Sequence, residues 1–166
     1  MSSQESNLRK DFIYKHLPYR LNVLMSHDIL THPCSKPILE NEKIILERSL
    51  EASIVFGRLL MNFLGVTIED KIDKKFKRYG KRNTDYDIQN LGYDYLDFNH
   101  PIFKQNENEI HTLIKYANKT VAHCTSIFPS NAEQDQFKTA KKAIYELVIT
   151  HITEIDRSKL SWEKYK

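Results

Sequence analysis

The sequence predicts an all-α fold, a bundle of four main helices in a single domain over residues 1–166. Glycine and proline are scarce, with 4 and 5 copies, so little turn chemistry is present for many short strands. Apolar residues recur at helical spacing in several long segments. The hydrophobic share of 40% and charged share of 28% are ordinary for a globular protein with a sizeable core.

The composition also bears on where the chain resides. Arg58 and Asn62 interrupt the most apolar stretch, so no run reaches the roughly 18 apolar residues of a membrane span. The N-terminal residues are polar, and no apolar signal segment follows them. Cys34 and Cys124 lie far apart without C-x-x-C spacing, which is typical of free thiols in a reducing compartment. We therefore expect a cytoplasmic protein with no membrane partner.

The first main helix is expected over residues 18–30, after a frayed tail of about eight residues and a less regular connection. Apolar residues from Ile13 to Ile29 keep helical spacing, but Pro18 interrupts the pattern and places the cleaner helix after itself. Residues 31–36 then read as a loop.

The second helix is the longest and is expected over residues 38–64, between Pro37 and Gly65. A proline costs little in the first turn, and a glycine commonly follows the last one. The second half is apolar around most of its circumference, which predicts a central helix surrounded by neighbours. A narrow polar strip on it consists of Arg48, Glu51, Arg58 and Asn62. We expect this strip to form an internal ion-pair network, and a partner surface is the alternative.

Residues 66–100 are expected to form an aromatic-rich excursion from the bundle. They contain too many aromatic residues for a disordered linker, and a short helix is predicted near residues 70–79. The first part is basic and the second part acidic, with Asp85, Asp87, Asp94 and Asp97.

The basic part of the excursion is a candidate RNA-binding segment. Cationic side chains interleaved with Phe76 and Tyr79 can follow a phosphate backbone and stack on bases. A solvated surface, partly neutralised by the aspartates that follow, is the alternative and is slightly favoured. The candidate RNA-binding residues are Lys74, Lys75, Lys77, Arg78, Lys81 and Arg82.

The third helix is expected over residues 106–127 and the fourth after residue 130. Ser130 and Glu133 match a capping box, which marks the start of the fourth helix. His151 falls on the apolar stripe of that helix, which favours a buried, structural histidine.

Residues 116–123, late in the third helix, contain a histidine, an amide and a lysine closer together than in any other predicted helix of the chain. At about 100° per residue, Lys119 and His123 share one side, outside the apolar face. Asn118 lies on the opposite flank if the helix is unbroken, and Cys124 lies on the apolar face. A partly exposed His123 could move protons near neutral pH while Lys119 stabilises an anion. Ordinary solvated surface is the alternative.

Metal and cofactor motifs are missing from the sequence. No glutamate has a histidine three positions later, as a di-iron bundle needs, and there is no H-E-x-x-H. The four glycines are scattered, so no phosphate-binding loop can form. We expect no metal and no cofactor.

A helical bundle that carries Asn118-Lys119 and Ala122-His123 late in the chain resembles the HEPN superfamily. It is most similar to the branch associated with abortive infection in phage defence. The signature of that family is an arginine, often followed by a polar residue such as asparagine, and then a histidine after a short helical spacer. Asn118 and His123 match the polar residue and the histidine, and Ala117 stands at the arginine position.

The resemblance covers about residues 38–157 and implies a metal-independent ribonuclease that works as a homodimer, with two motifs facing each other across a cleft. The residues carried over as catalytic are His123 and Asn118. Lys119 would substitute for the missing arginine, or Arg58 would reach in from the central helix. The alternative is a non-catalytic helical module that dimerises, or that binds RNA, a nucleotide or a protein partner.

Overall fold

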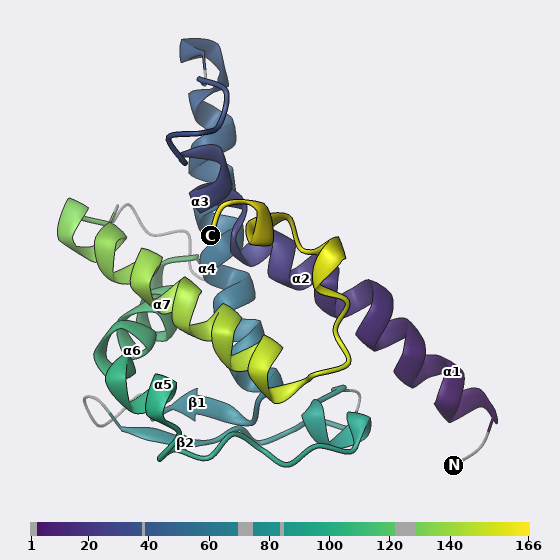
Figure 1. The fold of residues 1–166 in the computed structure, drawn as a ribbon. Coiled ribbons are helices and arrows are strands. Elements are labelled where there is room, and N and C mark those ends of the chain that lie inside the picture. Colours follow the sequence, from purple (N-terminus) through teal and green to yellow (C-terminus); the bar gives the residue numbers. More distant parts are fainter. Residues whose placement is uncertain (1–2, 38, 70–74, 84, 122–128) are drawn as a thin grey trace.

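The protein folds as a helical bundle with one small hairpin, which confirms the predicted all-α class (Figure 1). The two longest helices are α4 (Lys43–Phe63) and α7 (Asn131–His151). Helix α4 packs against helices on several sides and so has the central position that its apolar circumference predicts. The computed structural model describes residues 3–37, 39–69, 75–83, 85–121 and 129–166.

The N-terminal segment is helical from its first described residue, so the predicted frayed tail is wrong there. It consists of α1 (Ser3–Asp11), a π-helical turn η1 (Phe12–His16), α2 (Leu17–Leu24) and α3 (Ser26–Leu30). Figure 1 shows α1 and α2 following one another along one side of the bundle. Arg9 anchors α1, because its guanidinium pairs with Glu154 and its Nε donates to the Leu91 carbonyl oxygen at 3.0 Å.

Pro18 lies in the first turn of α2 and does not stop the helix. A proline has no N–H for the carbonyl four residues earlier, and its ring crowds that carbonyl. The turn before it is widened into a π-helix, in which the Leu17 N–H donates to the Phe12 carbonyl oxygen. The chain thereby continues as a helix on both sides of Pro18.

Helix α4 begins later than predicted, because residues 40–42 form a 3-10 turn, η2 (Glu40–Glu42), before it. Its end is as predicted. Gly65 follows the last turn with φ +83°, a left-handed conformation that favours glycine, and its N–H donates to the Asn62 carbonyl oxygen.

The excursion is ordered, as predicted, but it contains strands where a short helix was expected. Strands β1 (Val66–Ile68) and β2 (Phe76–Arg78) pair antiparallel, with Thr67 opposite Lys77. The helix predicted near residues 70–79 is therefore wrong for 76–78, and residues 70–74 lie outside the described part. Strands of three residues are too short to show an alternating pattern in the sequence.

The rest of the excursion packs on the bundle through its aromatic residues. It contains a 3-10 turn, η3 (Ile88–Leu91), and leads into a short helix, α5 (Pro101–Gln105). The partly buried aromatic side chains that contact the core are Phe76, Tyr86, Tyr93, Tyr95 and Phe98.

The third predicted helix is divided into α6 (Glu107–Tyr116) and a π-helical turn, η4 (Ala117–Val121). Ser130 and Glu133 form the predicted capping box of α7. After α7 come two 3-10 turns, η5 (Arg157–Lys159) and η6 (Ser161–Lys164). Within the described ranges, no helix is long and apolar enough to cross a membrane.

Candidate functional site

The described part of the motif, residues 116–121, begins at the end of α6 and continues along the turn η4. Asn118 is partly buried and Lys119 is exposed. Ala117, at the position where the resemblance would require an arginine, is 2% exposed and belongs to the core. An arginine at this point of η4 would have to bury its charge among apolar side chains. His123 lies outside the described residues.

The π-helical turn changes the angular positions on which the prediction for Asn118 rested. Counting 100° per residue holds only for an unbroken α-helix, and η4 widens the turn that begins at Ala117. Asn118 contacts the central helix, where its Oδ1 accepts a hydrogen bond from Arg58 Nη1 at 3.1 Å. Arg58 of α4 therefore reaches the motif from a position 60 residues away in sequence.

Arg58 is a partly buried cation, and few groups among the described residues balance its charge or bond to its N–H donors. Its Nε is buried and has no hydrogen-bond partner among the described residues. None of the ion pairs formed among the described residues includes Arg58. Among the described residues, Arg58 therefore takes no part in the predicted ion-pair network and bonds to an amide instead. A guanidinium that no described carboxylate pairs with can bind an anion, and its planar fork suits a phosphate group.

Asn62 and Tyr79 extend this polar region beyond Arg58. Asn62 lies one turn further along α4, and its Oδ1 is buried with no hydrogen-bond partner in the part of the chain that the structure describes. The Tyr79 hydroxyl donates to Asp85 Oδ2 at 3.0 Å. Burial and this hydrogen bond raise the pKa of Tyr79, while the positive charges of Arg82 and Arg58 act in the opposite direction.

Three residues of the basic run are engaged by the protein itself. Lys75 pairs with Glu69 at 3.3 Å, and Lys81 pairs with Asp87 at 3.1 Å. Arg78 donates to the Leu96 carbonyl oxygen at 2.6 Å and lies over two aromatic rings of the excursion. The charge of Lys81 is therefore neutralised by an aspartate that follows the basic run, as the alternative of a solvated surface predicts.

Two other residues of the run, Lys77 and Arg82, are more accessible to a ligand. Both are exposed, and neither side chain belongs to an ion pair within the described ranges. Lys77 lies on strand β2, and Arg82 follows it in the connection to Asp85. Lys74 lies outside the described residues.

His151 has the structural role that its position on α7 predicts, although it is only partly buried. Its Nε2 donates to the Asp94 carbonyl oxygen at 2.8 Å, and its ring is tilted against that of Tyr93. It thereby attaches the excursion to the end of α7.

No cluster of three or more potential metal ligands occurs in the part of the chain that the structure describes. Cys34 is a free, exposed thiol, and Cys124 lies outside that part. Comparisons with protein-family models, with curated proteins and with solved structures found no match.

Sequence reasoning missed Arg20, Tyr79 and Asp85 as members of this region. They come from α2 and from two points of the excursion, and no short motif connects them. The packing of α2 and of the excursion against α4 brings them together around one pocket, beside Asn62.

Proposed function

We propose that this protein is a HEPN-like, metal-independent ribonuclease that binds RNA where α4 meets η4. The observation that carries the proposal is the hydrogen bond from Arg58 to Asn118. It supplies an arginine beside the asparagine of the motif, although Ala117 occupies the arginine position in the sequence. We further propose a cytoplasmic homodimer that acts in phage defence or in a toxin–antitoxin pair.

In the proposed complex, Arg58 binds the phosphate at which the RNA is cleaved. One Nη1 hydrogen bond goes to Asn118, and the remaining donors of the guanidinium have no carboxylate partner among the residues that the structure describes. Lys119, which follows Asn118 in η4, is exposed and adds a second positive charge. Lys77 and Arg82 extend the contact along the RNA backbone.

The reaction needs two proton transfers and no metal. The 2′-oxygen attacks the neighbouring phosphorus, and the bond to the 5′-oxygen of the next nucleotide breaks. The products are a 2′,3′-cyclic phosphate and a 5′-hydroxyl. One group removes the 2′-hydroxyl proton and another protonates the leaving oxygen, as histidine does near neutral pH. His123 carries out one transfer, and the motif of a second copy carries out the other.

Replacing Arg58 with glutamine is expected to weaken binding of a single-stranded RNA by about tenfold or more, because a hydrogen bond between charged groups contributes about 1.5–3 kcal/mol. The salt dependence of binding should fall by about one phosphate contact. Fluorescence anisotropy of a labelled RNA oligonucleotide, titrated at several salt concentrations, measures both.

Arg48→Gln is the matched control, because Arg48 is an exposed arginine on the same helix with no ion pair to a described residue. It should leave the affinity within about twofold of the wild type. Equal losses in both variants would mean that only net charge matters, and no loss in Arg58→Gln would contradict the proposed phosphate contact.

The second candidate function is a non-catalytic interaction module, and exposed apolar residues near the start of α4 favour it. Leu39, Ile44 and Ile45 are all exposed, at the end of α4 that projects from the rest of the bundle (Figure 1). Such residues are typical of an interface with a second copy or another protein. Cleavage of a single-stranded RNA separates the two candidates, because a non-catalytic module leaves the RNA intact whether or not it binds it.

A further inference from the structure

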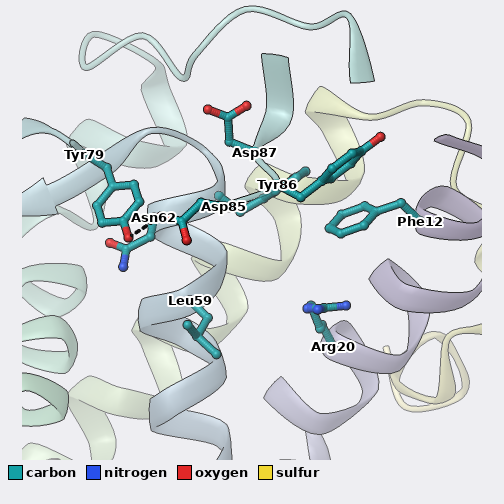
Figure 2. A pocket seen from close by; sticks show the side chains of 9 residues that line it. Phe12, Arg20, Leu59, Asn62, Tyr79, Asp85, Tyr86 and Asp87 are labelled. Atoms are coloured by element: carbon teal, nitrogen blue, oxygen red, sulfur yellow. Dashed lines mark hydrogen bonds between the residues drawn. The ribbon is translucent and has the colours of Figure 1, made fainter. Parts of the chain in front are cut away.

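A pocket of about 350 Å³ opens beside Asn62, one turn from Arg58. It lies where η1 and α2, the end of α4 and the excursion meet. Its volume is at the lower end of the roughly 300–1,000 Å³ typical of small-ligand sites. Figure 2 shows two unlike walls: Asn62, Tyr79 and Asp85 on one side, and Phe12, Tyr86 and Arg20 on the other.

The polar wall presents a carboxylate with an unused acceptor. The Arg82 backbone N–H and the Tyr79 hydroxyl both donate to Asp85 Oδ2, at 2.9 and 3.0 Å. These two bonds hold the pKa of Asp85 below its usual value, so the group is ionised at neutral pH. They also fix the orientation of the carboxylate. Its other oxygen, Oδ1, accepts no hydrogen bond from the residues that the structure describes.

Asn62 adds an amide to the same wall. Its Oδ1 is buried, and no described residue donates a hydrogen bond to it, which is unfavourable unless a ligand supplies a donor. The Tyr79 hydroxyl hydrogen is used by Asp85 and does not satisfy it. An amide carries a donor as well as an acceptor. Asn62 and Asp85 together therefore offer one donor and two acceptors to a ligand in the pocket.

The opposite wall is aromatic and positively charged. The rings of Phe12 and Tyr86 have centroids 4.5 Å apart, and the Arg20 guanidinium lies 5.2 Å from the Phe12 centroid. Arg20 donates to the His16 carbonyl oxygen, and no carboxylate among the described residues pairs with it. Flat ring systems bind against such a surface, and the guanidinium can bind a phosphate.

We infer that this pocket binds a guanine base. Guanine presents one acceptor, O6, next to two donors, N1–H and the 2-amino group, which complements the donor of Asn62 and the acceptors of Asn62 and Asp85. Adenine, cytosine and uracil do not have two adjacent donors on one edge. The inference rests on the proposed function in one respect: within an RNA, the pocket would select the guanosine whose neighbouring phosphate contacts Arg58.

The test is binding of the four nucleoside monophosphates to the full-length protein, measured by isothermal titration calorimetry. We expect GMP to bind at least tenfold more tightly than AMP, CMP or UMP. Asp85→Asn should lose about tenfold in GMP affinity, whereas Asp94→Asn, an exposed aspartate of the same excursion, should bind GMP as the wild type does. Leu59→Trp is a second variant that keeps the fold, because Leu59 lines the pocket but is 40% exposed. It should abolish GMP binding by filling the pocket.

Equal binding of all four nucleotides, or GMP affinity unchanged in both Asp85→Asn and Leu59→Trp, would overturn the guanine site. Its failure is distinguishable from failure of the proposed function. RNA binding that depends on Arg58, without any GMP binding, would overturn the guanine site and leave the proposed function standing. GMP binding that depends on Asp85, in a protein that does not bind RNA, would support the pocket and contradict the proposed function.

Discussion

Replacing Lys141 with methionine is expected to lower the free energy of unfolding by about 3–5 kcal/mol, the usual cost of removing one partner of a buried ion pair. Lys141 of α7 is 1% exposed and pairs with Asp28 of α3, which is almost as deeply buried. Burial lowers the pKa of Lys141, and the Asp28 carboxylate opposes that shift. Without the lysine, a carboxylate is left in the core with no counter-charge. Urea unfolding followed by circular dichroism measures the loss.

The matched control is Lys138→Met, an exposed lysine one turn earlier on α7, which should change stability by no more than about 0.5 kcal/mol. The double variant Asp28→Leu/Lys141→Met should recover most of the stability, because it removes both charges from the core. A double variant as unstable as Lys141→Met would show that packing, not the unpaired charge, causes the loss.

Replacing Gly65 with alanine is expected to destabilise the protein by about 3 kcal/mol or more, through backbone strain and overlap together. Gly65 has φ +83°, and a Cβ built on it would lie 2.2 Å from Cδ1 of Tyr95. The Tyr95 ring cannot move away freely, because its hydroxyl donates to the buried Asp87. The melting temperature and the urea midpoint should both fall.

Gly92 supplies a control with the same backbone conformation and no overlap. Its φ is +84°, and a Cβ built there has no neighbour within 4 Å. Gly92→Ala should therefore cost only the strain of the left-handed conformation, about 1–2 kcal/mol. Equal losses at the two glycines would mean that the contact with Tyr95 contributes nothing.

Much of the fold could be predicted because its signals are local. Gly65 ends α4 and the Ser130 capping box begins α7, since each needs only a few neighbouring residues. The hairpin was missed because its strands are too short to show a period. The helix through Pro18 was missed because the spacing of the apolar residues does not reveal the widened turn that precedes the proline. The buried pair of Lys141 and Asp28 was missed because each residue looks like surface until α3 and α7 pack together.

The candidate site was less predictable, because it depends on contacts between distant segments. The sequence indicates that residues 116–123 are chemically unusual and that Arg58 interrupts an apolar helix. It does not indicate on which side of the helix Asn118 lies, because the π-helical turn begins one residue before it. The bond between Arg58 and Asn118 follows from that turn and from the packing of η4 on α4.

Cleavage of a fluorogenic single-stranded RNA in the presence of EDTA tests most directly whether Arg58 and His123 form one catalytic site. We expect the wild type and Arg48→Gln to cleave at the same rate. His123→Ala and Arg58→Gln should each be at least about 100-fold slower, since a general acid or base and a charged phosphate contact each contribute on that scale. The products should end in a 2′,3′-cyclic phosphate. Wild-type activity no greater than that of His123→Ala would contradict a catalytic site that combines Arg58 and His123.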